Sequence, residues 1–397
     1  MFIRTLAQPL KEFATKYPSL AILGPRQSGK STLSKNVFPD YAYLSFEDRS
    51  IRERAALDPK GFLESYNQAP GLIFDEFQRQ PEILSYIQLA IDNKYQPGRF
   101  ILTGSQNFLM NEKISQSLAG RVAILTLMPL SIAELAGNKL LQNSIEDVLF
   151  TGGYPRIYDQ KLNPVIWYSD YIETYVEKDI KQLTNIADLE LFRKFVALCA
   201  GRVGQTLDLT SLSNDCGISV PTVRRWLSLL QSSYIIFLLQ PYYKNFGKRK
   251  TKSPKLYFYD TGLACSFLNI EKPAQLANHY LRGGLFESFI ISEIIKFLYN
   301  TGRRPKIYFW QEAGRTEIDC IIEKADEFIA IEIKASATSS KDFFKGLEIW
   351  NQIAQCDSKN NFVVYTGKET ERWPGGMFIN WQQLPDMLEK QFGKLVI

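Results

Sequence analysis

Short apolar runs alternate with helix-like segments in the N-terminal part of the chain. Such runs lie at 20–23, 41–46, 71–74 and 99–102, and the helix-like stretch 81–91 separates the last two. Apolar runs of this kind are typical of strands that are covered on both faces. Alternation of strands with helices predicts a doubly wound, parallel α/β sheet.

The pattern changes after residue 150. Tyr, Glu, Lys and Asp recur at helical spacing over 167–183, which predicts a helical connector. Further on, a helix, a turn at Gly217 and a second helix follow one another, with Ser219 as N-cap and Pro221 in the first turn. The strand-like run 234–239 comes next. This order resembles a winged helix-turn-helix.

The C-terminal part returns to a mixture of helix and strand. An amphipathic helix runs through residues 284–297, and apolar strand-like runs follow at 306–310, 317–322 and 328–335. These elements predict a second α/β region, separate from the N-terminal sheet.

Composition limits the class of protein. The chain has 397 residues, which corresponds to about two to four domains. Its 45% hydrophobic and 22% charged residues are ordinary for globular proteins. The net charge of +5 permits nucleic-acid binding without requiring it. The N-terminus does not resemble a signal peptide and no apolar run is long enough to span a bilayer, so we expect a cytoplasmic protein without a membrane partner.

Cysteine and histidine content excludes several chemistries. The five cysteines are scattered without a C-x-x-C pair, which argues against disulfides and zinc and favours a reducing compartment. His279 is the only histidine, so His-based triads and H-E-x-x-H zinc sites are excluded, apart from schemes that use this single imidazole. Any hydrolysis must then use carboxylates, lysine, bound metal or phosphate-binding groups.

The strongest motif directly follows the first apolar run and fits G-x-x-x-x-G-K-[ST]. A strand, a glycine-containing loop and a helix N-terminus surround a phosphate with N–H groups. Lys30 can reach the β- and γ-phosphates of a nucleoside triphosphate, and the Ser31 hydroxyl can bind Mg²⁺. A chance match in a Gly/Ser loop is the disfavoured alternative. The residues predicted to bind the nucleotide are Gly24, Pro25, Arg26, Gln27, Ser28, Gly29, Lys30, Ser31 and Thr32.

Further candidates for this site follow the later strands. Asp75 ends the run 71–74 and is predicted to hold Mg²⁺, while Glu76 is placed to orient or deprotonate the attacking water. Ser105 is predicted to sense the γ-phosphate, with an ordinary strand exit as an equal alternative. Arg121 is a candidate for neutralising the transferring phosphoryl group, in its own subunit or a neighbour's. The alternative for Arg121 is a surface pair with a carboxylate.

These motifs together carry a family resemblance. The strings G-P-R-Q-S-G-K-S, I-F-D-E, L-T-G-S and L-A-G-R…L-x-P-L-S resemble AAA-type P-loop ATPases of bacteria and archaea. The resemblance is to the branch whose C-terminal half carries a nuclease-like region, and it extends over nearly the whole chain. Since no N-K-x-D string follows, we expect ATP rather than GTP. The resemblance implies hydrolysis of ATP with Mg²⁺.

Basic residues cluster around the predicted winged helix. Arg224 and Arg225 lie early on its second helix. The predicted basic wing consists of Lys244, Lys248, Arg249, Lys250, Lys252 and Lys255. Together they predict contact with DNA. The alternative is a protein–protein module in which the basic run is a solvated loop.

The C-terminal strands carry a carboxylate–lysine pattern. Glu332 and Lys334 lie two residues apart and so on one face of a strand. If Asp319 lies on the neighbouring strand, two carboxylates that suit Mg²⁺ meet a lysine that can polarise or help to deprotonate a metal-bound water. With Glu287 on the preceding helix, the pattern resembles the PD-(D/E)xK nuclease superfamily. The resemblance implies that Glu287, Asp319 and Glu332 bind metal and that Lys334 is catalytic.

This resemblance has one departure and one alternative. No proline precedes Asp319, which follows Glu317-Ile318. The alternative is a degenerate domain that keeps the fold as a binding surface. We therefore predict four parts: an ATPase domain (1–145), a helical lid or connector (146–189), a winged helix-turn-helix (190–262) and a restriction-endonuclease-like α/β domain (263–397).

The predicted function follows from these parts. We expect a Mg²⁺-dependent ATPase coupled to a DNA-binding, DNA-cleaving C-terminal domain, with DNA and further copies of the chain as partners. One alternative is a nucleotide-gated DNA- or protein-binding module that cuts nothing. Another is protein remodelling by an AAA-type ring.

Overall fold

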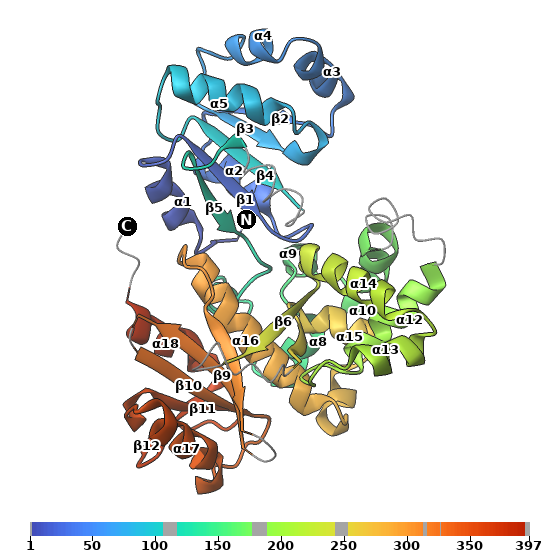
Figure 1. Ribbon diagram of the computed structural model, residues 1–397, viewed down its shortest axis with the longest axis vertical. Coiled ribbons are helices and arrows are strands. Elements are labelled where there is room, and N and C mark those ends of the chain that lie inside the picture. Colours follow the sequence, from blue (N-terminus) through green and yellow to red (C-terminus); the bar gives the residue numbers. More distant parts are fainter. Residues whose placement is uncertain are drawn as a thin grey trace.

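The computed structural model describes residues 2–105, 117–176, 189–242, 253–312, 316–325 and 327–393. The N-terminal part contains a parallel sheet in the order β2-β3-β4-β1-β5 (Figure 1). Its strands are β1 (Ser19–Leu23), β2 (Ala42–Ser45), β3 (Leu72–Asp75), β4 (Phe100–Gly104) and β5 (Val122–Thr126). The parallel α/β sheet predicted from the apolar runs is therefore confirmed.

Helices cover both faces of this sheet because alternate residues of each strand point to opposite sides. On β1, Leu20 and Ile22 belong to one buried cluster, whereas Ala21 and Leu23 belong to another. The first cluster includes residues of α1 and α2, and the second includes residues of α5. The helices here are α1 (Ala7–Ala14), α2 (Lys30–Val37), α3 (Arg49–Leu57), α4 (Pro59–Glu64), η1 (Phe77–Arg79) and α5 (Ile83–Asn93).

A helical region follows the sheet and ends in a β-hairpin. Its first helices are α7 (Ile132–Gly137), α8 (Ile145–Thr151), α9 (Pro155–Asp159), α10 (Pro164–Tyr171) and the π-helix η2 (Ile172–Val176). The next are α12 (Leu189–Ala200), α13 (Leu209–Cys216) and α14 (Val220–Ser232). The antiparallel strands β6 (Ile236–Pro241) and β7 (Lys255–Phe258) come after them, followed by α15 (Thr261–Phe267) and η3 (Pro273–Asn278).

The C-terminal part is a mixed sheet in the order β12-β13-β11-β10-β9-β8-β6-β7. Its further strands are β8 (Ile307–Gln311), β9 (Glu317–Lys324), β10 (Glu327–Lys334), β11 (Asn361–Tyr365), β12 (Glu371–Trp373) and β13 (Gly376–Asn380). Its helices are α16 (Arg282–Asn300), η4 (Lys341–Phe344), α17 (Lys345–Ala354), η5 (Ser358–Asn360), η6 (Trp381–Gln383) and α18 (Leu384–Phe392).

The hairpin β6–β7 belongs to this C-terminal sheet. Gln240 and Pro241 of β6 pair in parallel with Tyr308 and Phe309 of β8. One buried cluster also runs without interruption from Ile132 in α7 to residues of α18. The boundary predicted between residues 262 and 263 therefore falls inside a shared sheet and a shared core.

Helix α16 lies in the middle of the molecule (Figure 1). It packs against β7 and β10 of the C-terminal sheet, against α8 and α15, and against β5 of the N-terminal sheet. Most of its residues are buried, which fits its contacts on several sides. Within the described ranges, no helix has the length and apolar character needed to cross a bilayer.

Candidate functional site

The loop between β1 and α2 depends on its two glycines. Gly24 has φ +147°, and a Cβ atom there would lie 2.1 Å from the carbonyl oxygen of Leu127. Gly29 has φ +95° and precedes α2, whose first helical bond runs from the Leu33 N–H to the Gly29 oxygen at 2.8 Å. Only glycine adopts such backbone angles readily. The predicted strand–loop–helix arrangement is therefore present.

Lys30 is buried at the start of α2, with 5% of its surface exposed. Its ammonium group donates to the carbonyl oxygens of Gly24 (3.1 Å) and Pro25 (2.7 Å). Burial lowers its pKa to about 8, although the nearby Glu76 and Asp75 act in the opposite direction. The charge of Lys30 is thus incompletely compensated, which favours an incoming anion.

Asp75 gathers three hydroxyl groups around its carboxylate. Ser31 Oγ donates to Asp75 Oδ1 at 2.7 Å, Thr103 Oγ1 donates to the same oxygen, and the Tyr43 hydroxyl donates to Oδ2 at 2.5 Å. Burial, followed by the hydrogen bond to Asp75, raises the pKa of Tyr43. Sequence reasoning missed Thr103 and Tyr43. Asp75 pairs with Thr103 across the parallel strands β3 and β4. This pairing brings Thr103 to the carboxylate, since the carboxyl ends of parallel strands share one edge.

Glu76 and Ser105 also meet at this edge. Ser105 Oγ lies 3.3 Å from Glu76 Oε2, and the Gln78 amide donates to the same carboxylate. Glu76 adopts φ +53°, an uncommon angle for a residue other than glycine. Such backbone angles often occur at functional sites. The structure thus brings these two predicted residues together and adds Gln78, which the sequence did not indicate.

A cavity of ≈ 660 Å³ opens beside Lys30. Its volume lies in the range of about 300–1,000 Å³ that is usual for small-molecule sites. The loop, the first turn of α2 and Glu76 form one side. Residues of α9, among them Arg156, and Tyr175 of η2 form the other. The guanidinium of Arg26 stacks over the Tyr175 ring at 5.2 Å. Sequence reasoning treated the segment before α9 only as a turn and so missed Arg156.

The remaining predicted loop residues differ in exposure. Pro25 and Ser28 are buried, Arg26 and Gln27 are half-buried, and Thr32 is exposed. Gln27 and Thr32 line the same cavity as Lys30. Of the predicted nucleotide-binding segment, the structure therefore places Gln27 and the residues 29–32 at the cavity.

Arg4 holds the loop from behind. Its guanidinium donates to the carbonyl oxygens of Ser28 and Met128, each at 2.6 Å, and to Glu134 Oε1 at 3.0 Å. Glu134 is itself buried and forms a capping box with Ser131 at the start of α7. Nothing in the sequence indicated Arg4, because its partners are up to 130 positions away.

Arg121 does not lie at this site. It precedes β5, whose first residue Val122 pairs with Ser19 at the start of β1, whereas the loop follows the other end of β1. Its guanidinium pairs with Asp92 through two contacts of 2.6 and 3.0 Å. A role for Arg121 in its own subunit is therefore wrong, because a strand of about 15 Å separates it from the loop.

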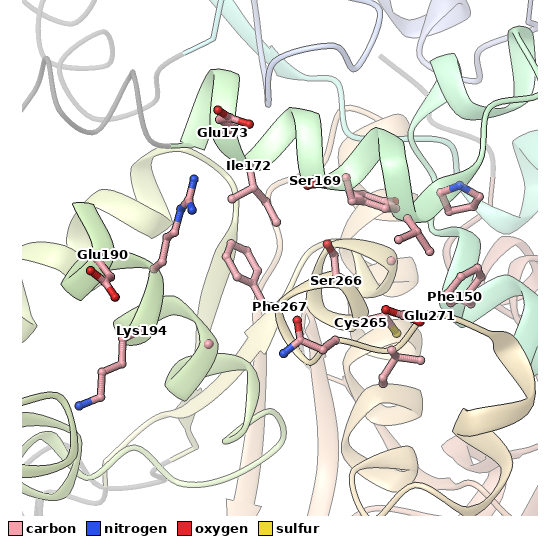
Figure 2. A pocket seen from close by; sticks show the side chains of 18 residues that line it. Phe150, Ser169, Ile172, Glu173, Glu190, Lys194, Cys265, Ser266, Phe267 and Glu271 are labelled. Carbon is pink, nitrogen blue, oxygen red and sulfur yellow. The ribbon is translucent and has the colours of Figure 1, made fainter. Parts of the chain in front are cut away.

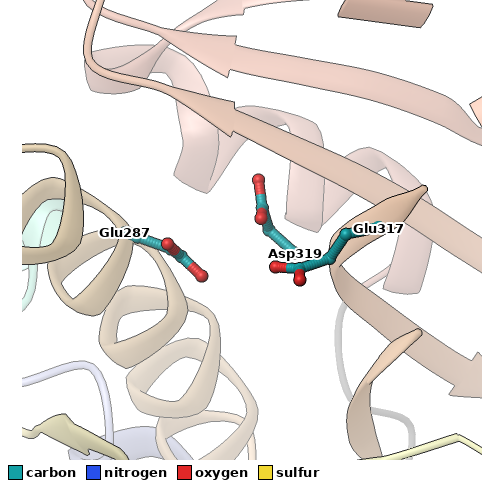
Figure 3. A group of neighbouring side chains, drawn as sticks. All are labelled: Glu287, Glu317 and Asp319. Carbon is teal, nitrogen blue, oxygen red and sulfur yellow. The ribbon is translucent and has the colours of Figure 1, made fainter. Parts of the chain in front are cut away.

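A carboxylate cluster lies between α16 and the C-terminal sheet (Figure 3). The side chain of Glu287 extends from α16 toward Asp319, and Glu317 stands two residues before Asp319 on β9. One carboxylate oxygen from each residue lies within 4.8 Å of the others. Glu317 was not predicted as a ligand, although residues i and i+2 of a strand share a face and alternation could have indicated it.

Glu332 and Lys334 of β10 adjoin this cluster. Because Ile331 pairs with Cys320 in the antiparallel register, the next step places Glu332 opposite Asp319. Lys334 Nζ lies 2.5 Å from Glu332 Oε1. Among the described residues, Glu332 Oε2 is buried and has no hydrogen-bond partner. The structure thus brings Glu287, Asp319, Glu332 and Lys334 together.

The carboxyl groups here are harder to ionise than usual. Burial, reinforced by the charge of Asp319, raises the pKa of Glu287 to about 7 and that of Glu332 to about 8. Such shifts mark a buried site in which neighbouring carboxylates also repel one another. Clustered carboxylates with a free buried oxygen fit a hard divalent cation such as Mg²⁺.

Lys255, predicted to belong to an exposed basic wing, is instead buried in this cluster. Its ammonium lies 3.1 Å from Glu287 Oε1 and 4.0 Å from Asp319 Oδ1, and it also contacts Glu317. The prediction failed because Lys255 begins β7, whose side chains on this face point toward α16 rather than to solvent. The other residues of the predicted wing, Lys244, Lys248, Arg249, Lys250 and Lys252, lie outside the described residues.

A second cavity, of ≈ 540 Å³, lies among α10, η2, α12 and α15 (Figure 2). Charged side chains such as Glu173, Glu190 and Lys194 line one part of it, and Phe150 and Cys265 line another. Burial raises the pKa of the Cys265 thiol, which argues against a reactive thiolate. Sequence reasoning did not indicate this cavity, and its lining residues predict no particular chemistry.

Comparison with protein families divides the chain into three parts. Residues 16–136 match the AAA domain family. Residues 142–274 and 282–384 each match a domain of unknown function, DUF8612 and DUF4143. Together with the loop geometry, the first match shows that the N-terminal part is an AAA-type P-loop ATPase domain.

Several proteins resemble the chain over most of its length. An uncharacterized protein of Mycobacterium tuberculosis is 28% identical over 341 residues, which cover 85% of this chain and 75% of that protein. An uncharacterized protein of Haemophilus influenzae is 24% identical over 351 residues, covering 79% and 81%.

Solved structures resemble the chain more distantly. A Walker-type ATPase of Pyrococcus abyssi has a TM-score of 0.47 and 15% identity, over 67% of this chain and 96% of that one. AMPPCP-bound DnaA of Aquifex aeolicus has a TM-score of 0.29 and 15% identity, over 57% and 85%.

Proposed function

We propose that the chain binds and hydrolyses ATP with Mg²⁺ at the loop after β1, and that this controls a DNA-cleaving site in its C-terminal part. The observation that carries the first half is that Lys30 and Ser31 line one cavity while Ser31 donates a hydrogen bond to Asp75. A buried ammonium, a hydroxyl and a carboxylate at a helix N-terminus suit the phosphates and the metal ion of a nucleotide.

Each residue then has a role that its position supports. The loop residues 24–32 surround the phosphates, and Lys30 neutralises their charge. Ser31 and Asp75 would hold Mg²⁺, which would supply further charge stabilisation. Glu76 orients the attacking water, and Ser105, 3.3 Å from Glu76, senses the γ-phosphate.

The second half of the proposal rests on the carboxylate cluster. Glu287, Asp319 and Glu332, joined by Glu317, would hold Mg²⁺, which supplies an activated water for phosphodiester hydrolysis. Lys334, which pairs with Glu332, would polarise a water or phosphate oxygen beside the cluster. The buried oxygen of Glu332 without a partner among the described residues supports a cation here.

DNA contact is proposed for the helical region. The order α12-α13-α14-β6-β7 resembles that of a winged helix-turn-helix, whose second helix enters the major groove. Arg224 and Arg225 are exposed on α14, the helix in this position. Their charge suits contact with DNA phosphates.

A second candidate function is a nucleotide-gated binding module that cuts nothing. The ammonium of Lys255 favours it, because this group already lies among the carboxylates that a metal ion would need. The two functions share the ATPase domain and differ only in the chemistry of the cluster.

One experiment separates the two functions. Plasmid and branched DNA are incubated with Mg²⁺ or Mn²⁺ and ATP, and DNA cleavage and phosphate release are both measured for the wild type, Lys30→Ala and Asp319→Asn. We expect Lys30→Ala to lower phosphate release by about 100-fold or more. We expect Asp319→Asn to abolish cleavage without changing phosphate release.

Asp386→Asn, an exposed change on α18, serves as the control and should retain both activities. If neither the wild type nor Asp319→Asn cleaves DNA, the result would favour the binding module. Unchanged phosphate release by Lys30→Ala would contradict the ATPase.

A further inference from the structure

The carboxylate cluster is completed by a lysine from outside the C-terminal segment. The carboxylates of Glu287, Glu317 and Asp319 lie within the part that matches DUF4143, at residues 282–384. Lys255 lies within the part that matches DUF8612, at residues 142–274. Strand β7 brings it there, because this strand packs against α16, the helix that carries Glu287.

Strand β7 contributes two groups to the cluster. Lys255 Nζ lies 3.1 Å from Glu287 Oε1 and contacts Glu317, and only 5% of the Lys255 side chain is exposed. Tyr257, two residues further and on the same face, donates its hydroxyl to Glu287. The ammonium also lies 5.5 Å from the centre of the Phe309 ring. These contacts fix the ammonium at the centre of the carboxylates.

An ammonium in this position occupies the space of a metal ion. Three carboxylate oxygens within 4.8 Å of one another can surround one divalent cation at the usual distances of about 2.0–2.6 Å. Lys255 approaches all three of these carboxylates. The ammonium and a metal ion cannot both sit among them.

The cluster has more carboxylate oxygens than its two lysines can satisfy. Four carboxylates, those of Glu287, Glu317, Asp319 and Glu332, share the two lysines Lys255 and Lys334. Within the described part of the chain, Glu332 Oε2 is buried without a hydrogen-bond partner. This surplus of carboxylates over lysines and this free oxygen both point to a cation as the missing ligand.

We propose that Lys255 is an internal counter-ion that competes with a divalent cation for Glu287, Glu317 and Asp319. The proposal rests on the metal site of the proposed function but not on DNA cleavage. When Lys255 lies among the carboxylates, metal affinity is low.

The test measures Mn²⁺ binding to the nucleotide-free, full-length chain by calorimetry and by thermal unfolding. Lys255→Met should bind Mn²⁺ about tenfold or more tightly than the wild type. Its unfolding temperature should be lower than the wild-type value without metal and should rise more when Mn²⁺ is added. Lys255→Gln, which keeps polar contacts with the carboxylates but lacks the charge, should show the same gain if Lys255→Met fails to fold.

Lys296→Met is the matched control. Lys296 is an equally buried lysine on α16, 2.7 Å from Glu293, with 4% of its side chain exposed. Its loss should also lower the unfolding temperature, but the affinity for Mn²⁺ should stay at the wild-type value. This control separates competition at the cluster from the general effect of removing a buried lysine.

Wild-type or weaker Mn²⁺ affinity in both Lys255 variants would overturn the proposal. A gain that persists when Glu317→Gln is added to Lys255→Met would also overturn it, because the ion would then bind elsewhere. The proposed nuclease fails separately. If the Lys255 variants bind Mn²⁺ more tightly but no DNA is cleaved, Lys255 competes with the cation and the nuclease is rejected. If the wild type cleaves DNA but the Lys255 variants do not bind Mn²⁺ more tightly, the nuclease stands and the competition is rejected.

Discussion

Lys30 and Lys255 are both buried lysines at candidate sites, yet their surroundings shift their pKa values in opposite directions. Burial lowers the pKa of Lys30 to about 8, and the nearest acceptors of its ammonium are carbonyl oxygens. Burial would also lower the pKa of Lys255, but the carboxylates of Glu287, Asp319 and Glu317 raise it above its ordinary value. One ammonium still lacks an anion, whereas the other already has three.

This difference indicates what each site can accept. A site whose cation is poorly compensated gains from binding an anion, such as the phosphates of a nucleotide. A site with excess carboxylates gains from another cation, or from exchange of its lysine for one. The same residue type therefore indicates phosphate binding in the N-terminal domain and cation binding in the C-terminal part.

The largest expected effect concerns stability. Lys255→Met should lower the free energy of unfolding by about 3–5 kcal/mol, because it leaves buried carboxylates without their partner. Lys30→Met should change it by no more than about 1 kcal/mol, because it removes a charge that burial disfavours. Urea denaturation of the nucleotide-free chain, followed by circular dichroism, measures both. Equal losses of unfolding free energy in Lys255→Met and Lys30→Met would contradict the inferred difference between the two lysines.

A smaller effect is expected from pH. Phosphates stabilise the protonated form of Lys30, whose pKa in the free protein is lowered to about 8. The affinity for ATP should therefore be maximal below that pH. It should fall as the pH rises through this value, by up to about tenfold per pH unit. Equilibrium titrations at several pH values measure this fall.

Lys30→Arg provides the control for pH, because a guanidinium stays charged over this range. Any affinity for ATP that it retains should not fall above pH 8. If the wild type binds ATP equally well far below and far above pH 8, the charge of Lys30 is not the poorly compensated group that we infer.

The N-terminal site could largely be predicted from the sequence, because its chemistry is carried by contiguous motifs. The loop containing Lys30 and the strand ending at Asp75 each place their functional residues within a few positions. Arg4 could not be predicted, because its role depends on Ser28, Met128 and Glu134, which only the fold brings near it.

The C-terminal site was predicted less completely. Alternation along β10 was sufficient to place Glu332 and Lys334 on one face. Lys255 was assigned to a basic wing because its neighbours in the sequence are basic, whereas its environment is set by partners 32 to 64 positions away. Whether a charged residue is buried depends on such tertiary partners, and the local sequence does not contain them.

The most direct test of the central claim compares ATP with AMP in calorimetric titrations of the nucleotide-free chain with Mg²⁺. If the phosphates of a nucleotide supply the anion that Lys30 lacks, ATP should bind at least about 100-fold more tightly than AMP, which has no β- or γ-phosphate. Lys30→Met should remove most of this difference. Equal binding of ATP and AMP, or no binding of ATP by the wild type, would contradict the account.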